Sequence, residues 1–324
     1  MANERYGNNY LVALGVQTDY DTENPEYTVV LPDKVEMKKT IAAIDISQKT
    51  GVLSKKNTEK LAGYTGGEVT LSGQLVPGSG VTNLHGILLE AMFTGTSAFV
   101  VPGVGTTPNS YSIYQFFNSD DKGNIGLSCV MESFNITGSS GGGIDYTANF
   151  RPKAVTYEAN LASGDHIVEN ASDEDPFVNI PDITPAIFAD TTLTTMGGAT
   201  AITTLNSFSI DLTNTFADDA SIYQNSNTKS QEILTGFEGS FTAEWNYNKS
   251  ATGDPAISAD LMADALTSIV LAITDGTNIW TFTLYGKVTE YSFADPDKGI
   301  FTSSMTMELM SDDSHIPVSI AISQ

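Results

Sequence analysis

The stretch Leu61–Gly66 reads LAGYTG, and a close copy of it, LTGFEG, stands at Leu234–Gly239. The second copy begins 173 residues after the first. At the same offset, and without a gap, the apolar residues of segment 84–93 fall on those of segment 257–266. At 324 residues the chain has the length of about two domains of roughly 100–200 residues. The repeat therefore predicts two similar domains in one chain.

Alternating apolar and polar residues predict that each copy consists mainly of strands, because a period of two marks a half-buried strand. In the first copy the expected strands are Thr40–Gln48, Gly67–Val76, Ser97–Val101, Ser110–Phe117, Gly126–Thr137 and Gly143–Tyr157. In the second copy they are Thr203–Leu212, Gly239–Trp245, Ile269–Ile273, Ile279–Leu284, Lys287–Phe293 and Ile300–Met310. Before the repeat, Tyr10–Val16 is expected to form a strand and Asp19–Pro32 a loop.

Each copy also carries one stretch with helical spacing, at Asn83–Phe93 and at Ile257–Thr267. With short, turn-rich connections, this pattern predicts a mainly β protein with two tandem β-sandwich or small-barrel domains, each with one flanking α-helix. The expected divisions are an N-terminal arm and first strand at 1–34, a first domain at 35–158, an acidic linker at 159–185 and a second domain at 186–324. The first copy has an insertion of about 15 residues after its helix.

The formal charge is −24, from 39 acidic and 15 basic residues. The two halves share it unequally: residues 1–158 hold 16 acids and 11 bases, whereas residues 159–324 hold 23 acids and 4 bases. Such a chain lacks the Lys and Arg surface that holds duplex DNA by its phosphates. Acidity either gives solubility or repels DNA.

Residues with catalytic or metal-binding spacing are scarce. Cys129 stands alone in an expected strand, which predicts a buried structural thiol. The three histidines, His85, His166 and His315, have no spacing that suggests acid–base or metal chemistry, and we expect them at the surface. Three acidic clusters, at 19–26, 173–175 and 295–297, could bind calcium, but none has the ligand pattern of an EF-hand loop. We therefore expect a protein that is not an enzyme and needs no cofactor or metal.

The sequence also shows neither of the two signals that direct a chain to a membrane. The N-terminal residues lack a basic-then-apolar leader, and no apolar run reaches the ~20 residues that a membrane helix needs. We expect a chain that is made and assembled in the cytoplasm without a membrane.

The order of elements resembles a known family: a strand, a long polar loop, a strand, a helix and then two strand pairs. The opening Arg5-Tyr6 and Tyr10–Val12, the segment Gly66–Phe93, the strand Ser207–Asn214 and the strand Thr235–Phe241 are similar to those of phage major tail tube proteins of the long-tailed type. The resemblance covers most of the chain. In this family a mainly β domain forms stacked rings around a lumen that carries DNA during ejection.

The resemblance implies a virion structural protein of the phage tail, assembled in the host cytoplasm. Its ring usually has six single-domain subunits, so three copies of a two-domain chain would form a trimer with pseudo-sixfold symmetry. The implied partners are further copies of the chain, the tape measure protein, the tail terminator and distal tail proteins, and genomic DNA that passes without specific binding. An acidic lumen wall would repel the phosphates and leave no site where DNA sticks.

Two polar loops hold the same position in the two copies, and in the family this loop reaches the adjacent ring. The first holds Lys49, Lys55, Lys56 and Lys60; the second holds Asp218, Asp219 and Lys229. We expect complementary charge between these loops to set the register of stacked rings. The plainer interpretation is a solvated loop.

A binding module is the alternative: a carbohydrate- or receptor-binding β-sandwich of the kind found in phage adhesins. A cluster of exposed aromatic side chains with nearby acids would favour it. Of the aromatic residues, Trp245 and Trp280 lie in expected strands, so core packing or an inter-domain contact is the default for both.

Overall fold

The computed structural model describes the larger part of the chain. That part comprises residues 10–20, 22–24, 26–45, 60–79, 85–95, 98–117, 122–161, 167–168, 184–195, 200–202, 204–217, 232–247, 266–294 and 301–324.

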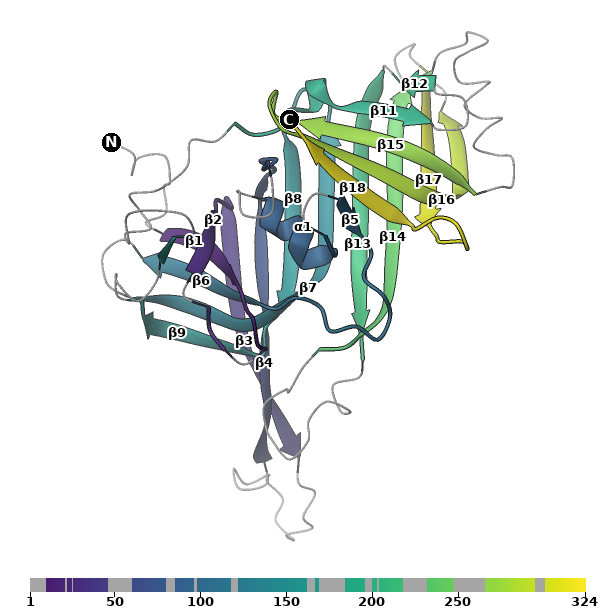
Figure 1. Cartoon of the computed structure of the whole chain (residues 1–324). Coiled ribbons are helices and arrows are strands. Elements are labelled where there is room, and N and C mark those ends of the chain that lie inside the picture. The colour runs from purple at the N-terminus through teal and green to yellow at the C-terminus, as the bar shows by residue number, and fades with distance from the viewer. Residues whose placement is uncertain are drawn as a thin grey trace, which may run out of the picture.

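The fold is mainly β, as the alternation predicts (Figure 1). The first half contains β1 Tyr10–Val16, β2 Glu26–Val30, β3 Lys34–Asp45, β4 Lys60–Gln74, helix α1 Gly86–Met92, β5 Ala98–Val100, β6 Tyr111–Phe117, β7 Lys122–Ser139, β8 Ile144–Arg151 and β9 Ala154–Asn160. The short β10 Ile167–Val168 follows. The second half contains the 3-10 helix η3 Phe188–Asp190, β11 Thr192–Thr195, β12 Thr200–Ile202, β13 Leu205–Phe216, β14 Leu234–Asn246, β15 Thr267–Thr274, β16 Ile279–Ala294, β17 Thr302–Leu309 and β18 Val318–Ser323.

Eight antiparallel strands form what we call the main sheet, in the order β3-β4-β8-β7-β13-β14-β17-β16. Four come from each half, and the halves meet where β7 pairs with β13. Figure 1 shows β8, β7, β13 and β14 side by side across this junction. The two halves are therefore continuous through backbone hydrogen bonds.

The same order of strand pairing occurs in both halves. The first part of β7 pairs with β6 and β9, and β6 pairs with β1, which pairs with β2. The first part of β16 likewise pairs with β15 and β18, and β15 pairs with β11, which pairs with β12. Strands β1 and β2, which have no counterpart by sequence, thus hold the place that β11 and β12 hold in the second half.

Bulges fall at equivalent places in the two halves and refine the alignment. The β7–β8 register shifts between Met131 and Ser133, and the β16–β17 register shifts between Val288 and Glu290. The β3–β4 and β13–β14 hairpins each shift near the ends of β3 and β13. Matching these shifts pairs buried Val69 and Leu71 with buried Phe241 and Ala243. The ungapped offset of 173 would match these buried residues with outward-facing ones, because alternate strand residues face opposite sides. The offset is therefore one residue too long here.

Several expected boundaries are wrong. The expected loop before β3 contains β2, and the expected strand Gly143–Tyr157 is broken around Pro152 into β8 and β9. The separate strands expected at 279–284 and 287–293 are one strand, β16, which crosses from one sheet to the other. The sequence pattern also missed β18.

The first expected helix is present as α1, which packs against β7. The second, at 257–267, lies outside the described residues except for its end, where Thr267 begins β15. His85 precedes α1 and is fully buried, so its expected surface position is wrong.

One buried cluster runs through both halves. It includes α1, the inner face of the main sheet, and both tryptophans, Trp245 and Trp280. The inserted segment of the first half reaches the second half, since β5 pairs with β18 and Gly105 N–H donates to Leu234 O at 2.7 Å. The indole of Trp280 donates to Gly78 O at 3.1 Å. The halves are thus joined through their core as well as through the sheet.

Candidate functional site: the polar face of the main sheet

The main sheet has one apolar face and one polar face. The inner positions of β7, β8, β13, β14 and β17 are buried in the shared core, and the alternate positions face outward. The outward side chains of the first half are Lys34, Glu36, Lys38, Glu68, Thr70, Ser72, Asp145, Thr147, Asn149, Arg151, Ser133, Asn135 and Thr137; those of the second half are Ser207, Ser209, Asp211, Thr213, Glu238, Ser240, Thr242, Glu244, Ser304, Thr306, Glu308, Lys287, Glu290 and Ser292. We call this surface the polar face.

Small polar side chains join the strands across the polar face. Thr70 on β4 donates its hydroxyl to Asn149 Oδ1 on β8 at 2.8 Å, and Asn149 Nδ2 donates to Ser133 Oγ on β7 at 2.8 Å. At the junction of the halves, Asn135 Nδ2 donates to Ser209 Oγ at 3.3 Å and also to Asp211. These cross-strand pairs hold the strands in register and make the face hydrophilic.

Charge on the polar face is distributed by half. The second half presents Asp211, Glu238, Glu244, Glu290 and Glu308 against Lys287, whereas the first half presents both signs. The structure thus brings part of the excess acid of residues 159–324 onto one surface of one sheet.

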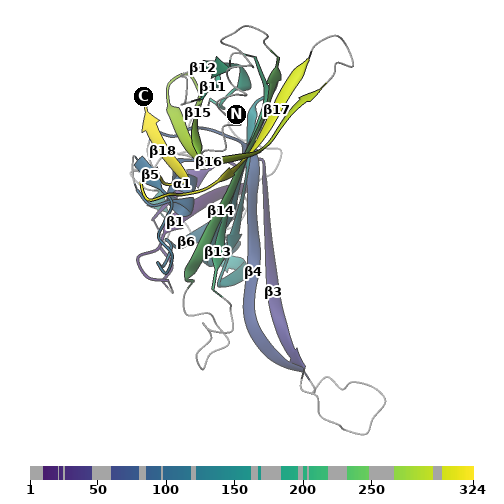
Figure 2. The same cartoon turned by 90° about the vertical axis from the view of Figure 1, so that its right-hand side faces the viewer.

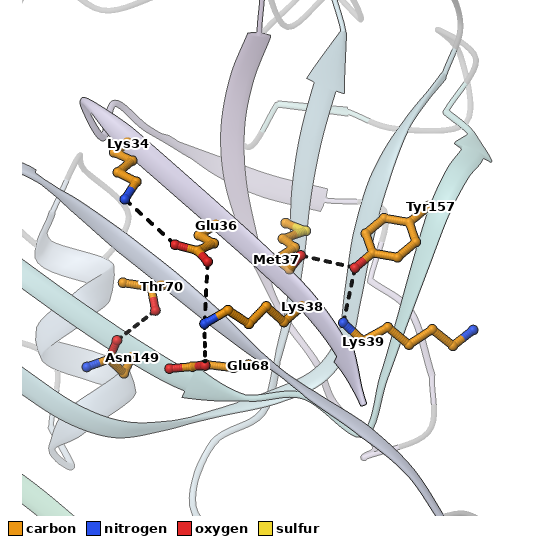
Figure 3. A network of polar contacts seen from close by, with 9 residues as sticks. All are labelled: Lys34, Glu36, Met37, Lys38, Lys39, Glu68, Thr70, Asn149 and Tyr157. Atoms are coloured by element: carbon orange, nitrogen blue, oxygen red, sulfur yellow. Dashed lines mark hydrogen bonds and ion pairs between the residues drawn. The ribbon is translucent and has the colours of Figure 1, made fainter. Parts of the chain in front are cut away.

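Two lysines of β3, Lys34 and Lys38, are engaged by glutamates, as Figure 3 shows. Lys38 Nζ donates to Glu68 at 3.1 Å and lies 3.4 Å from Glu36, which is 3.7 Å from Lys34 Nζ. The hydrogen bond to Glu68, followed by that to Glu36, raises the pKa of Lys38. All these side chains are exposed, so the pairs add little stability, but they neutralise the bases locally.

The junction of β7 and β13, which we call the internal seam, is closely packed on its inner side. Ile136 lies directly opposite Ile210, and Phe134 lies opposite Leu212, and each of these four side chains is at most 1% exposed. Asn214 is also buried there and donates to Met131 O at 3.2 Å.

A charged contact also crosses between the halves. Arg151 Nε lies 3.9 Å from the carboxylate of Glu232, whose side chain is 2% exposed, and the guanidinium covers the ring of Phe216 at 5.4 Å. Arg151 also lies 4.0 Å from Glu132 of the first half, so its guanidinium links the two halves.

The two outer edges of the main sheet are β3 and the second part of β16. In the described part of the chain, β4 is the one strand that pairs with β3, and β17 is the one strand that pairs with Val288–Ala294. Near the β16 edge, Phe293 is 50% exposed and Phe301 41% exposed, with ring centroids 5.1 Å apart. Tyr247 lies edge-on to Phe293 at 4.9 Å.

Most of the predicted ring-stacking residues lie outside the described part: Lys49, Lys55, Lys56, Asp218, Asp219 and Lys229. Lys60 is described in its backbone, as the first residue of β4, opposite Asp45. The two loops do connect equivalent hairpins, β3–β4 and β13–β14. Figure 2 shows the β3–β4 hairpin projecting beyond the rest of the main sheet.

Burial favours the uncharged form of two titratable groups, Cys129 and His85. Cys129 is buried in β7, as predicted, and burial raises the pKa of its thiol. His85 accepts a hydrogen bond at Nδ1 from Val76 N–H at 2.8 Å, and burial lowers its pKa to about 3. Within the described ranges no group of three His, Cys, Asp or Glu side chains is placed to hold a metal ion. A helix of the length and apolarity needed to cross a bilayer is likewise not found in these ranges.

No protein-family model and no curated protein matches the chain. Among solved structures, a chain from the virion of a native gene transfer agent particle aligns with 42% of this chain and 96% of its own length, at 12% identity and a TM-score of 0.31. A likeness of this size carries no argument about function.

Proposed function

We propose that the chain is a structural protein of a phage tail that assembles into rings, with the polar face of the main sheet lining a DNA conduit. The observation that carries the proposal is the internal seam, where two equivalent four-stranded units already join edge to edge in one chain. Repeating that join between chains would extend the same sheet around a ring. Closure would also remove the exposed sheet edges, which are a liability in a free β protein.

Three chains would form such a ring, each contributing two similar units, so that the ring is a trimer with pseudo-sixfold symmetry. The units correspond to the domains at 35–158 and 186–324. Stacked rings would make a tail tube, with the tape measure, terminator and distal tail proteins as its partners in the virion.

The composition of the polar face suits a wall along which DNA slides. Phosphates are repelled by exposed acids, and Lys34 and Lys38 on this face are already paired with glutamates. Hydroxyl and amide side chains, which fill most other positions, engage one another across the strands. Among the described residues the polar face therefore offers no unpaired basic patch that would hold the DNA backbone.

Electron microscopy of the purified protein tests the assembly directly. Negatively stained rings or tubes with a stain-filled centre and three- or sixfold averages are the expected result. A monomer that persists at high concentration and low salt would contradict the proposal.

A substitution of the face tests its role. Replacing Glu238, Glu244 and Glu308 by lysine should leave rings intact but make them retain duplex DNA in a salt-dependent manner, because each neutralised phosphate releases a counterion. The matched control replaces the same residues by glutamine, which removes charge without creating a cation. If the lysine variant retains no more DNA than the unaltered chain, the polar face does not line the conduit.

Stacking is proposed to depend on the two hairpin loops. Reversing the charge of Lys55 and Lys56 should weaken or shorten tubes while leaving single rings, and should change the salt dependence of tube length. Tubes that stack with unchanged salt sensitivity would contradict complementary charge as the source of register.

A carbohydrate-binding module is the second candidate, and the exposed group of Phe293, Phe301 and Tyr247 favours it. Sugar rings stack on exposed aromatic faces. Against this alternative, Phe293 and Phe301 stack on each other, with 10° between their planes, so each ring already has an aromatic partner. Glycan binding that is lost in Phe293→Ala, in a chain that never forms rings, would favour this alternative.

A further inference from the structure

One hydroxyl group in the first half occupies the outer edge of β3. Tyr157 OH accepts a hydrogen bond from Lys39 N–H at 3.0 Å and donates one to Met37 O at 3.1 Å (Figure 3). These two backbone groups lie on the side of β3 that faces away from β4. They are the groups that an added antiparallel strand would use.

The backbone of β9 is distorted where it presents this tyrosine. The β7–β9 register shifts between Gly123 and Ile125, so that Tyr157 and Glu158 lie in a bulge of β9. Glu158 has a φ of 53°, in the left-handed region that costs a residue with a side chain roughly 1–2 kcal/mol. Bulges commonly re-aim a side chain, and here the bulge directs Tyr157 at β3.

The internal seam shows what occupies this position in the other half. By the alignment of bulges and buried faces, β13 corresponds to β3 and β7 corresponds to β16. The edge of β13 equivalent to the one that Tyr157 contacts is covered by β7. The strand expected at the β3 edge is therefore the second part of β16 from another copy of the chain.

Burial at the equivalent positions agrees with this assignment. Ile136 and Ile210 face each other at the seam, and both are fully buried. Their counterparts are Phe293 on β16, which is 50% exposed, and Met37 on β3, which is half-buried. Joining two copies in the register of the seam would place Phe293 against Met37 and cover both.

We propose that Tyr157 is a placeholder: it occupies the β3 edge in the isolated chain and is displaced by β16 of a second copy when the ring closes. This inference rests on the ring proposed above and adds one step to its assembly, the displacement of Tyr157 from the β3 edge. Exchange of the tyrosine for a strand preserves hydrogen bonds at Lys39 and Met37. Until then the hydroxyl shields the edge from pairing out of register or with unrelated strands.

Removing the hydroxyl tests the placeholder. Tyr157→Phe should lower the chain concentration at half-assembly by about fivefold or more, since the two hydrogen bonds of the hydroxyl, each worth about 1 kcal/mol, no longer have to be given up. It should also speed hydrogen exchange of the Lys39 amide in the unassembled chain. Tyr10→Phe is the matched control, because it removes an exposed hydroxyl that donates to Asp33 O at 3.3 Å.

Cross-linking tests the register. A chain with Met37→Cys and Phe293→Cys should form disulfides between copies, because directly opposed strand residues lie within disulfide reach. Val35→Cys with Phe293→Cys, two residues out of register, should not. The native Cys129 is buried and does not compete.

The outcomes separate the two ideas. Cross-linked rings with earlier assembly of Tyr157→Phe support both. Cross-linked rings with an unchanged assembly threshold and unchanged Lys39 exchange overturn the placeholder and leave the ring. Chains that stay monomeric in every variant, without cross-links, overturn the ring and the placeholder together.

Discussion

The internal seam and the outer edges of the main sheet consist of equivalent strands, yet they differ in what they bury. At the seam, Ile136 and Ile210 are fully buried in the core. The corresponding residues at the edges, Phe293 and Met37, are partly exposed to solvent. The seam is permanent because one chain supplies both strands. The edges carry exposed charged residues such as Lys39 and Glu290, and they are apolar at Met37 and Phe293, where a neighbour is expected to pack. The difference shows how a duplicated unit specialises into a fixed joint and a reversible one.

The largest expected effect separates the seam from its counterpart at the edge. Ile136→Ala should lower the free energy of unfolding by about 2–4 kcal/mol, because it removes a fully buried side chain and leaves a cavity. Phe293→Ala should cost under about 1 kcal/mol in the unassembled chain and act mainly on assembly. Urea denaturation at low protein concentration measures both. Similar losses at the two sites would remove the distinction between seam and edge.

The next effect concerns the charged contact between halves. Arg151→Met should cost about 2–3 kcal/mol, because the buried carboxylate of Glu232 loses its guanidinium neighbour and the Phe216 ring loses its cation. Lys38→Met, which removes an exposed cation from two glutamates, should leave the urea midpoint unchanged. If both variants lose the same stability, burial is not what gives Arg151 its importance.

A smaller effect depends on pH. The pKa of His85 is about 3 in the folded chain and about 6.5 when unfolded, so the unfolded state binds more protons between these values. This contribution to stability is complete above pH 6.5 and is lost as the pH falls toward 3. Between pH 7 and pH 5 His85 should account for about 2 kcal/mol of lost stability.

His85→Asn isolates that contribution, since its amide oxygen can accept from Val76 N–H but does not titrate. The variant should show a smaller difference between urea unfolding at pH 7 and at pH 5 than the unaltered chain. An equal pH dependence in both chains would assign the acid sensitivity to the carboxylates instead.

Local sequence patterns predicted much of the fold and little of the candidate site. Alternation located most strands, since the period of two reports which side of a strand is buried. It failed for β2 and β18, which are short, and for the crossing point inside β16. The acidic half was visible in composition, but which acids share a face depends on strand register. Residues such as Asp211 and Glu308 are brought together by pairing with β14.

The predicted ring-stacking loops show the other limit. Polarity and equivalent position marked them, and they stay a prediction, because of the seven residues only the backbone of Lys60 is described. Tyr157 carried no signal in the sequence at all. Its role depends on a bulge in β9 and on the proximity of β3, which is distant in the chain.

By itself the sequence determined that the chain is mainly β, duplicated, acidic in its second half, and that Cys129 is buried. These properties follow from periodicity, composition and local repetition. The tertiary structure decided that the two copies share one core and one sheet, that His85 is inside, and which strand edges remain at the periphery. Strand pairing between distant segments sets these features, and no local pattern encodes which segments will meet.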